Sequence, residues 1–298
     1  MASCKYRFSV VPGFFNDYKK AAERCPKSKL TRQPALGLLE RAYDTDAKPV
    51  DDRSLWTRFA SFVEALNHDS RPGESYKVLH LVRHGVSVHN VVMEKVGSAA
   101  WNSHWSHLDG DGTLTWVDAK VVDQGISQAE DLSNFWIAAS RDDGVPLPSI
   151  LYTSPLARCL EFTKLVYGPV MQRSNLSFAP IVKEGLRERL TDHTCDKRSS
   201  RSWISANYPE YILEPSFTEA DELWQADRWE SDADHQARAQ TVLEEVFKND
   251  AASFISLTTH SYAISAILSV IGAEVFRVSE GAIVTLLVKG VRLVSDGL

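Results

Sequence analysis

From residue 76 onward, short apolar runs alternate with stretches that have helical periodicity. Strands are predicted within residues 76–85, 150–153, 178–186, 253–260 and 281–290. Helices are predicted within residues 132–140, 154–168, 238–250 and 261–272, with Ser154 as N-cap and Pro155 in the first helical position. Such alternation favours a mostly parallel sheet that is covered on both faces. The predicted fold class is therefore α/β, with a mostly parallel central sheet and helices on both faces.

Polar side chains directly follow four of these strands. They are Arg83 and His84, then Ser154 and Arg158, then Arg187, Glu188 and Arg189, and finally His260. We expect these side chains at one edge of the sheet, because ligands bind at the carboxyl ends of parallel strands. Arginine matches phosphate oxygens, histidine can attack phosphorus, and a carboxylic acid can protonate a leaving oxygen. The set therefore indicates phosphate chemistry, while the absence of a Gly-x-x-x-x-Gly-Lys loop disfavours P-loop nucleotide hydrolysis.

The stretch "LVRHGVSVHN" resembles the Arg-His-Gly signature of the histidine phosphatase superfamily, which contains the cofactor-dependent phosphoglycerate mutases and many phosphatases. Four further elements resemble the family in the same order: "DQGISQAEDL", "YTSPLARCLEFT", "LRE" at 186–188 and the late histidine in "LTTHSY". The resemblance extends over residues 76–295 and is nearer to the phosphatase branch. It implies a phosphoglycerate mutase-like fold.

This resemblance implies roles for the residues that match the signature. His84 is implied as the nucleophile that forms phosphohistidine. Arg83, Arg158 and His260 are implied as the pocket that holds the phosphoryl oxygens. Gly85 is expected to let the backbone pass close to the phosphate.

The resemblance also implies a further hydrogen-bond donor and a proton donor. Asn90 is implied as a donor to the phosphate, with a loop cap as the alternative. Glu188 is implied as the general acid and then as the base that activates water, with Glu184 and Asp192 as near neighbours that leave the choice open. Two positions depart from the usual pattern, Val86 and Ser261, and neither removes a catalytic group.

The stretch "LRERLTDHTCDKRSSRSW" resembles a version found in some fungal and plant members of the family. We expect Arg187, His193 and Arg198 in this stretch to bind the substrate near its leaving group. A solvated basic loop is the alternative interpretation of the same residues.

The predicted domain organisation has two parts. Residues 1–75 form an N-terminal extension that packs on the core, with a semi-ordered arm as the alternative, and contain a helix over 55–66 capped by Asp51, Asp52 or Ser54. Residues 76–298 form the histidine phosphatase domain. Cap insertions are expected near 91–122 and 189–234, where tryptophans in polar loops indicate a packed lid or an apolar wall for the substrate.

The net charge and the cysteine content limit the kinds of partner and site that the chain is expected to have. A net charge of -6 argues against nucleic acid and anionic membranes, yet a local basic pocket is compatible with a small anionic substrate. The four cysteines, Cys4, Cys25, Cys159 and Cys195, form no C-x-x-C pair. They are interpreted as reduced thiols in a cytoplasmic protein, without a metal centre. The chain shows no apolar leader and no transmembrane run.

The leading hypothesis is a metal-independent phosphatase, a phosphoric monoester hydrolase, that acts on a small phosphorylated metabolite through phosphohistidine. No cofactor is expected, because arginines supply the positive charge. The alternative is a phosphoglycerate-type mutase that transfers the phosphoryl group within its substrate. A third possibility is a binding protein with an inactive phosphatase pocket. The choice of a monophosphate or a diphosphate ester and the oligomeric state stay open.

Overall fold

The computed structural model describes residues 5–48 and 51–293, and within them seven strands form one sheet in the order β1-β9-β3-β7-β4-β5-β6. The strands are β1 (Tyr6–Val10), β3 (Glu74–Arg83), β4 (Ile150–Thr153), β5 (Ile181–Val182), β6 (Ile212–Leu213), β7 (Phe254–Thr259) and β9 (Ile283–Arg292). β3, β7, β4, β5 and β6 are parallel to one another, whereas β9 is antiparallel to both β1 and β3. A separate parallel ribbon joins β2 (Lys29–Leu30) to β8 (Arg277–Val278).

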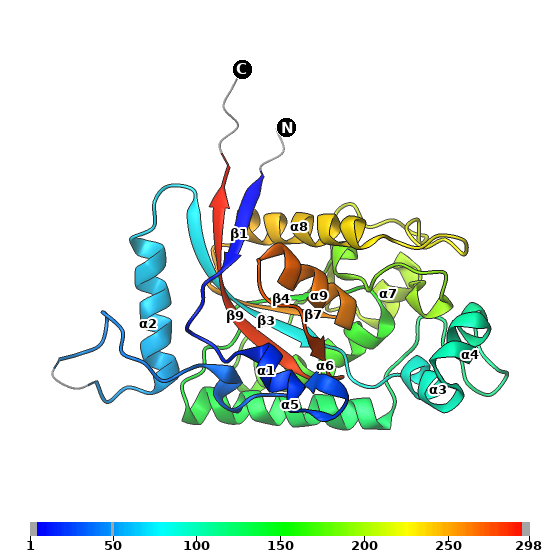
Figure 1. The fold of residues 1–298 in the computed structure, drawn as a ribbon, viewed down its shortest axis with the longest axis horizontal. Helices are drawn as coiled ribbons and strands as arrows, with labels where there is room; N and C mark the ends of the chain where they lie inside the picture. Colours follow the sequence, from blue (N-terminus) through cyan, green and yellow to red (C-terminus); the bar gives the residue numbers. More distant parts are fainter. Residues whose placement is uncertain (1–4, 49–50, 294–298) are drawn as a thin grey trace, which may run out of the picture.

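Helices cover both faces of this sheet, which confirms the predicted fold class. The helices are α1 (Tyr18–Glu23), α2 (Leu55–His68), α3 (Val88–Val96), α4 (Ser98–Ser103), α5 (Asp123–Asp142), α6 (Ala157–Arg173), α7 (Arg201–Asn207), α8 (Asp232–Asn249) and α9 (Ser261–Val270). Figure 1 shows α8 along the top of the sheet and α5 along the bottom, with the strands between them. In the described part of the chain, no helix is long and apolar enough to cross a membrane.

The segment before residue 76 contributes to this core. β1 pairs with β9 at one edge of the sheet, and α2 buries Trp56, Phe59 and Val63. Ser54 caps α2 by accepting a hydrogen bond of 3.2 Å from the backbone N–H of Thr57, which settles the choice among the three predicted caps. Residues 1–4, including Cys4, and residues 49–50 and 294–298 lie outside the described residues.

The predicted start of α6 was wrong by two residues. The helix begins at Ala157 with Leu156 as its N-cap, although Ser154 and Pro155 look like a cap and a first turn in the sequence. Asp118 takes over part of the capping, because its Oδ1 accepts a hydrogen bond of 2.8 Å from the backbone N–H of Ala157. Ser154 is bonded to His260 instead. A contact between distant segments thus replaces the local cap.

Gly85 lies where the loop after β3 meets the first turn of α5. A Cβ atom at Gly85 would stand 2.8 Å from the Cα and the carbonyl oxygen of Gly125. A Cβ atom at Gly125 would stand 2.2 Å from the carbonyl oxygen of Val86. Two glycines therefore let α5 approach the loop closely. Backbone packing explains Gly85 here, whereas the sequence pointed to a phosphate.

We expect Gly125→Ala to destabilise the protein by about 1–3 kcal/mol, because the new methyl group overlaps the backbone of Val86. Equilibrium urea unfolding measures this change. Ser127→Ala is the matched control, since Ser127 is exposed two residues further along α5. The control should stay within about 0.5 kcal/mol of the wild type. Equal stability of Gly125→Ala and the wild type would contradict the proposed close approach.

Candidate active site

A large cavity opens at the carboxyl edge of the parallel strands. Its volume is about 880 Å³, and its lining includes six of the predicted site residues: Arg83, His84, Asn90, Arg158, Glu188 and His193. His260 lies just behind this lining, fully buried, with its ring centroid 5.0 Å from that of His84. The structure therefore brings together the residues that follow the strands, as the parallel arrangement requires.

His84 has one ring nitrogen engaged and the other available. Its Nδ1 lies 2.7 Å from the carbonyl oxygen of Gly85. A carbonyl can only accept, so Nδ1 carries the proton and Nε2 keeps its lone pair. Burial, followed by the charges of Arg158 and Arg83, holds the pKa of His84 well below its ordinary value. The imidazole is therefore neutral near pH 7, which is the state that a nucleophile needs.

Arg83 is held at the edge of the sheet by two acceptors. It donates to the carbonyl oxygen of Val278 at 2.6 Å and pairs with Glu280 at 2.8 Å. Glu280 also accepts from Lys29 through both carboxylate oxygens, at 3.1 and 3.2 Å. Arg83 is thus held by β8, through Val278, and by the turn before β9, through Glu280. Lys29 of the N-terminal segment in turn holds Glu280.

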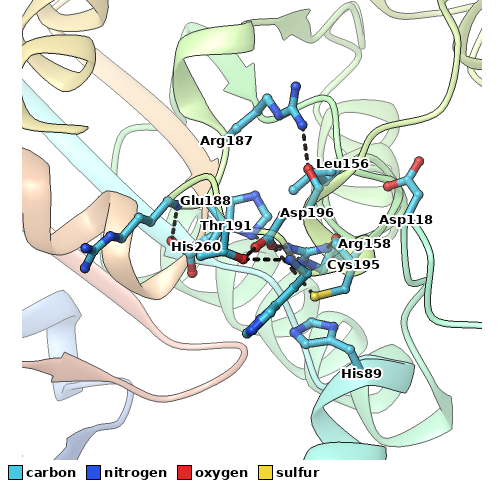
Figure 2. A network of polar contacts seen from close by, with 12 residues as sticks. His89, Asp118, Leu156, Arg158, Arg187, Glu188, Thr191, Cys195, Asp196 and His260 are labelled. Carbon is cyan, nitrogen blue, oxygen red and sulfur yellow. Dashed lines mark hydrogen bonds and ion pairs between the residues drawn. The ribbon is translucent and has the colours of Figure 1, made fainter. Parts of the chain in front are cut away.

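Arg158, the second arginine of the site, is hydrogen-bonded to His260 (Figure 2). Its Nε donates to His260 Nδ1 at 3.3 Å, and its other nitrogens reach the carbonyl oxygen of Cys195 at 2.6 Å and Asp196 Oδ1 at 3.4 Å. Since a guanidinium only donates, His260 Nδ1 accepts and the ring proton sits on Nε2, 2.8 Å from Ser154 Oγ. Burial, followed by the charge of Arg158, lowers the pKa of His260. His84 and His260 are therefore both neutral near pH 7.

Glu188 lies at the N-terminus of α9. Its carboxylate accepts backbone N–H groups from Arg189 and Tyr262 at 3.0 Å and from Ala263 at 3.1 Å. Burial, followed by the negative charge of Asp196, raises its pKa, although the hydrogen bond from Arg189 and the charges of Arg158 and Arg83 oppose the shift. A carboxyl group with a raised pKa holds a proton at higher pH than usual, and that suits a general acid.

Asn90 and His89 form a closed set of contacts with Ser87. Asn90 Oδ1 accepts from the backbone N–H of Ser87 at 3.1 Å, and Asn90 Nδ2 lies 3.1 Å from His89 Nε2. His89 Nδ1 lies 2.9 Å from Ser87 Oγ. Asn90 thus caps the start of α3, as the alternative interpretation had it, and it also lines the cavity. Its role as a donor to the phosphate stays a prediction.

The structure does not bring Arg187 and Arg198 to the cavity. Arg187 is fully buried and binds Asp221 through two hydrogen bonds of 2.7 Å. Arg198 donates to the carbonyl oxygens of Thr218 and Ala220 at 2.9 Å. In Figure 2, Arg187 lies apart from the group formed by Arg158, His260 and Glu188. Both guanidinium groups hold the loops around residues 184–221 together, because backbone carbonyls and carboxylates accept most of their N–H groups.

Two tryptophans of the first predicted cap segment pack together. Trp116 is fully buried and packs on Trp101 at a centroid distance of 5.9 Å. Trp101 and Trp229 line the cavity. Trp229 is 52% exposed and stands edge-on to His193 at 5.5 Å. An exposed indole at a cavity offers an apolar wall to a ligand.

The lining residues that the sequence analysis missed include Lys29, Arg277 and Glu280. Glu280 stands just before β9. Because β9 is antiparallel to β3, it begins at the edge of the sheet where β3 ends. If the sequence analysis had assigned 281–290 as an antiparallel strand, it would have predicted Glu280 at the edge of the sheet where the site lies. Lys29 comes from the N-terminal segment, and no local pattern places it at the site.

One group of potential metal ligands occurs among the described residues. His193, Cys195 and Asp196 each offer an atom, and these atoms lie within 4.8 Å of one another. Asp196 already accepts from Thr191 at 2.7 Å and from Arg158 at 3.4 Å. Burial raises the pKa of the Cys195 thiol well above its ordinary value. A cation here would compete with the guanidinium of Arg158.

Comparisons with known proteins place the chain in a family. The model of the histidine phosphatase superfamily (branch 1) matches residues 79–277. A probable phosphoglycerate mutase of Arthroderma benhamiae is 42% identical over 284 residues, covering 95% of this chain and 84% of that protein. The probable phosphoglycerate mutase PMU1 of Saccharomyces cerevisiae is 32% identical over 233 residues, covering 72% of this chain and 79% of that protein.

A solved structure, mycobacterial hydrolase 1, aligns with a TM-score of 0.43 at 17% identity, over 74% of this chain and 99% of that chain. The family match covers more than half of the residues and includes the Arg-His-Gly stretch, Arg158, Glu188 and His260. The chain therefore belongs to branch 1 of the histidine phosphatase superfamily, with a phosphoglycerate mutase-like sequence.

Proposed function

We propose that this protein is a phosphatase that hydrolyses a small phosphorylated metabolite through a phosphohistidine at His84, without a metal ion. The observation that supports this most directly is the state of His84. Its Nδ1 is held by the Gly85 carbonyl, and its ring lines the cavity beside Arg83 and Arg158. Two guanidinium groups supply the positive charge that a phosphoryl group needs.

The first step transfers the phosphoryl group to the enzyme. His84 Nε2 attacks phosphorus, the bond between phosphorus and the ester oxygen breaks, and that oxygen leaves with the bonding electrons. Protonated Glu188 gives its proton to the leaving oxygen. Arg83 and Arg158 are proposed to hold the phosphoryl oxygens, with His260 behind them as the acceptor that orients Arg158, and Asn90 and His193 are proposed to contact the substrate.

The second step restores the enzyme. Glu188, now ionised, takes a proton from water as the water oxygen attacks the phosphohistidine. The bond between phosphorus and His84 Nε2 breaks, and inorganic phosphate leaves. The same carboxyl group thus acts as acid and then as base, and each cycle returns it to the protonated state.

The names of the two fungal relatives favour a second candidate function, that of a phosphoglycerate mutase. A mutase uses the same phosphohistidine but returns the phosphoryl group to the substrate before water reaches it. The two functions therefore differ in the fate of the phosphoenzyme and not in the groups that form it.

We expect His84→Ala to lower phosphate release from 4-nitrophenyl phosphate by at least about a thousandfold, because the nucleophile is lost. Wild-type activity should persist when a chelator is present. His68→Ala, an exposed histidine on α2, is the matched control and should keep full activity. Retention of activity by a folded His84→Ala protein would show that another residue is the nucleophile.

We expect Glu188→Gln to affect alkyl phosphates far more than 4-nitrophenyl phosphate. An alkoxide needs a proton to leave, whereas 4-nitrophenolate leaves without one, so kcat should fall by about 100-fold or more only for the alkyl ester. Glutamine keeps an oxygen that can accept the N–H groups at α9, which preserves the cap. An equal loss on both substrates would argue against the role as general acid.

The pH dependence of alkyl ester hydrolysis should follow Glu188. The acid form is required, so wild-type activity falls as pH rises through the pKa of Glu188, which burial has raised. Glu188→Gln should lose this alkaline decline, whereas His68→Ala should keep it. Profiles of kcat/KM between pH 4 and pH 9, in steps of about half a unit, measure the effect.

Labelled substrate separates the two functions. With 3-phosphoglycerate that carries ³²P, we expect a hydrolase to release the label as inorganic phosphate from the first turnover. A mutase would retain the label in 2-phosphoglycerate, which chromatography resolves from the substrate. Predominant retention of the label would replace the phosphatase proposal with the mutase.

A further inference from the structure

One wall of the cavity comes from the β2–β8 ribbon and from the turn before β9. Lys29 on β2 is paired in register with Arg277 on β8, and both residues line the cavity. Glu280 in the following turn lines it as well. A segment near the N-terminus and a segment near residue 280 thus meet beside the proposed phosphate position.

The charges on this wall are unbalanced. Glu280 is the partner of both Lys29 and Arg83, so one carboxylate faces three cations when Arg277 is included. The wall is only partly covered, since Lys29 and Glu280 are 19% and 17% exposed in their side chains. A surplus of positive charge in a partly buried wall costs free energy, which a bound anion offsets.

Arg277 is the cation that has no partner. Among the described residues, the other cations of the cavity each have an acceptor: Glu280 for Lys29 and Arg83, Asp196 for Arg158, and Asp232 for Arg189. Arg277 has no hydrogen bond or ion pair within the part of the chain that the structure describes. It is exposed at the cavity, and a guanidinium can bind a carboxylate or a phosphate in bidentate fashion.

The wall lies beside the phosphate pocket and mostly outside the family match. Arg83 contacts Glu280 directly, and its pKa is lowered by burial and then, among nearby charges, by Arg277. Lys29 and Glu280 fall outside residues 79–277, and Arg277 is the last matched residue. Two of the three charged residues on this wall therefore lie outside the matched region, and the third lies at its end.

We propose that Arg277 and Lys29 form a second anion subsite, so that the substrate carries a phosphate ester and a further carboxylate or phosphate group. This inference rests on the proposed function, which places the reacting phosphoryl group at His84, Arg83 and Arg158. The second anion lies at the β2–β8 ribbon and orients the ester toward His84.

Three probes with one carbon skeleton test the subsite: propyl phosphate, 3-phosphooxypropanoate and propane-1,3-diol bisphosphate. Each is measured as an inhibitor of 4-nitrophenyl phosphate hydrolysis. In the wild type, we expect at least one of the two probes with a second anion to bind about tenfold more tightly than propyl phosphate. The better of these two identifies the second group as a carboxylate or a phosphate.

Arg277→Ala should reduce this preference to within about twofold, because the charge-assisted hydrogen bonds to the second anion are lost. The preference is the ratio of the inhibition constants of two probes measured on the same variant. A general change in the activity of that variant therefore cancels from the ratio. Arg24→Ala removes an exposed arginine of the N-terminal segment that does not line the cavity, and it should keep the preference.

Equal inhibition by all three probes in the wild type would overturn the subsite, and so would a preference that survives Arg277→Ala. Failure of the proposed function is a separate result, namely no wild-type turnover of 4-nitrophenyl phosphate. In that case, calorimetric titration of the wild type and of Arg277→Ala with the bisphosphate still tests the subsite. Equal affinity of the wild type and Arg277→Ala would overturn the subsite, and weaker binding by the variant alone would support it.

Discussion

The parallel register between β3 and β7 is the constraint on which the site depends. Arg83 pairs with Thr259, so the next residue of each strand, His84 and His260, leaves the sheet at the same level. The backbone N–H of His84 donates to the carbonyl of Thr259 at 3.1 Å and ties the two turns together. A shift of one residue would turn alternate side chains to the opposite face and separate the two rings.

Burial then determines the charge state of the groups that the register brings together. Both histidines are neutral because they are desolvated and because arginines stand beside them. The pKa of Glu188 is shifted upward, which favours its protonated form. The site therefore combines fixed positive charge from guanidinium groups with two neutral imidazoles and a carboxyl group whose pKa is raised. This combination suits the transfer of a phosphoryl group from an ester.

The sequence predicted the part of the site that depends on strand ends. Arg83, His84, Arg158 and Glu188 are close together because a parallel sheet collects the ends of its strands at one edge, and that rule can be read from an alternating pattern. The α/β class follows from the same pattern and is confirmed by the sheet order. Element boundaries were less certain, as the start of α6 shows, because Asp118 provides a cap from far along the chain.

The rest could not be predicted, because it depends on contacts between segments that no local pattern links. Arg187 and Arg198 look like substrate ligands beside a catalytic motif, but Asp221 and cap carbonyls satisfy them inside the protein. Lys29 looks like an ordinary surface lysine, but the β2–β8 ribbon brings it to the cavity. A charged side chain near a motif thus says little until its partner is known.

The position of β3 in the sheet has a consequence for biosynthesis. Its neighbours are β7 and β9, and both are encoded after residue 253. Residues 84–253 must be translated before β7 emerges, which takes on the order of ten seconds or more at ordinary rates of protein synthesis. Throughout this interval the apolar strand that leads to His84 has two unpaired edges. The nascent chain is therefore open to aggregation, and chaperones have time to bind it before the sheet closes.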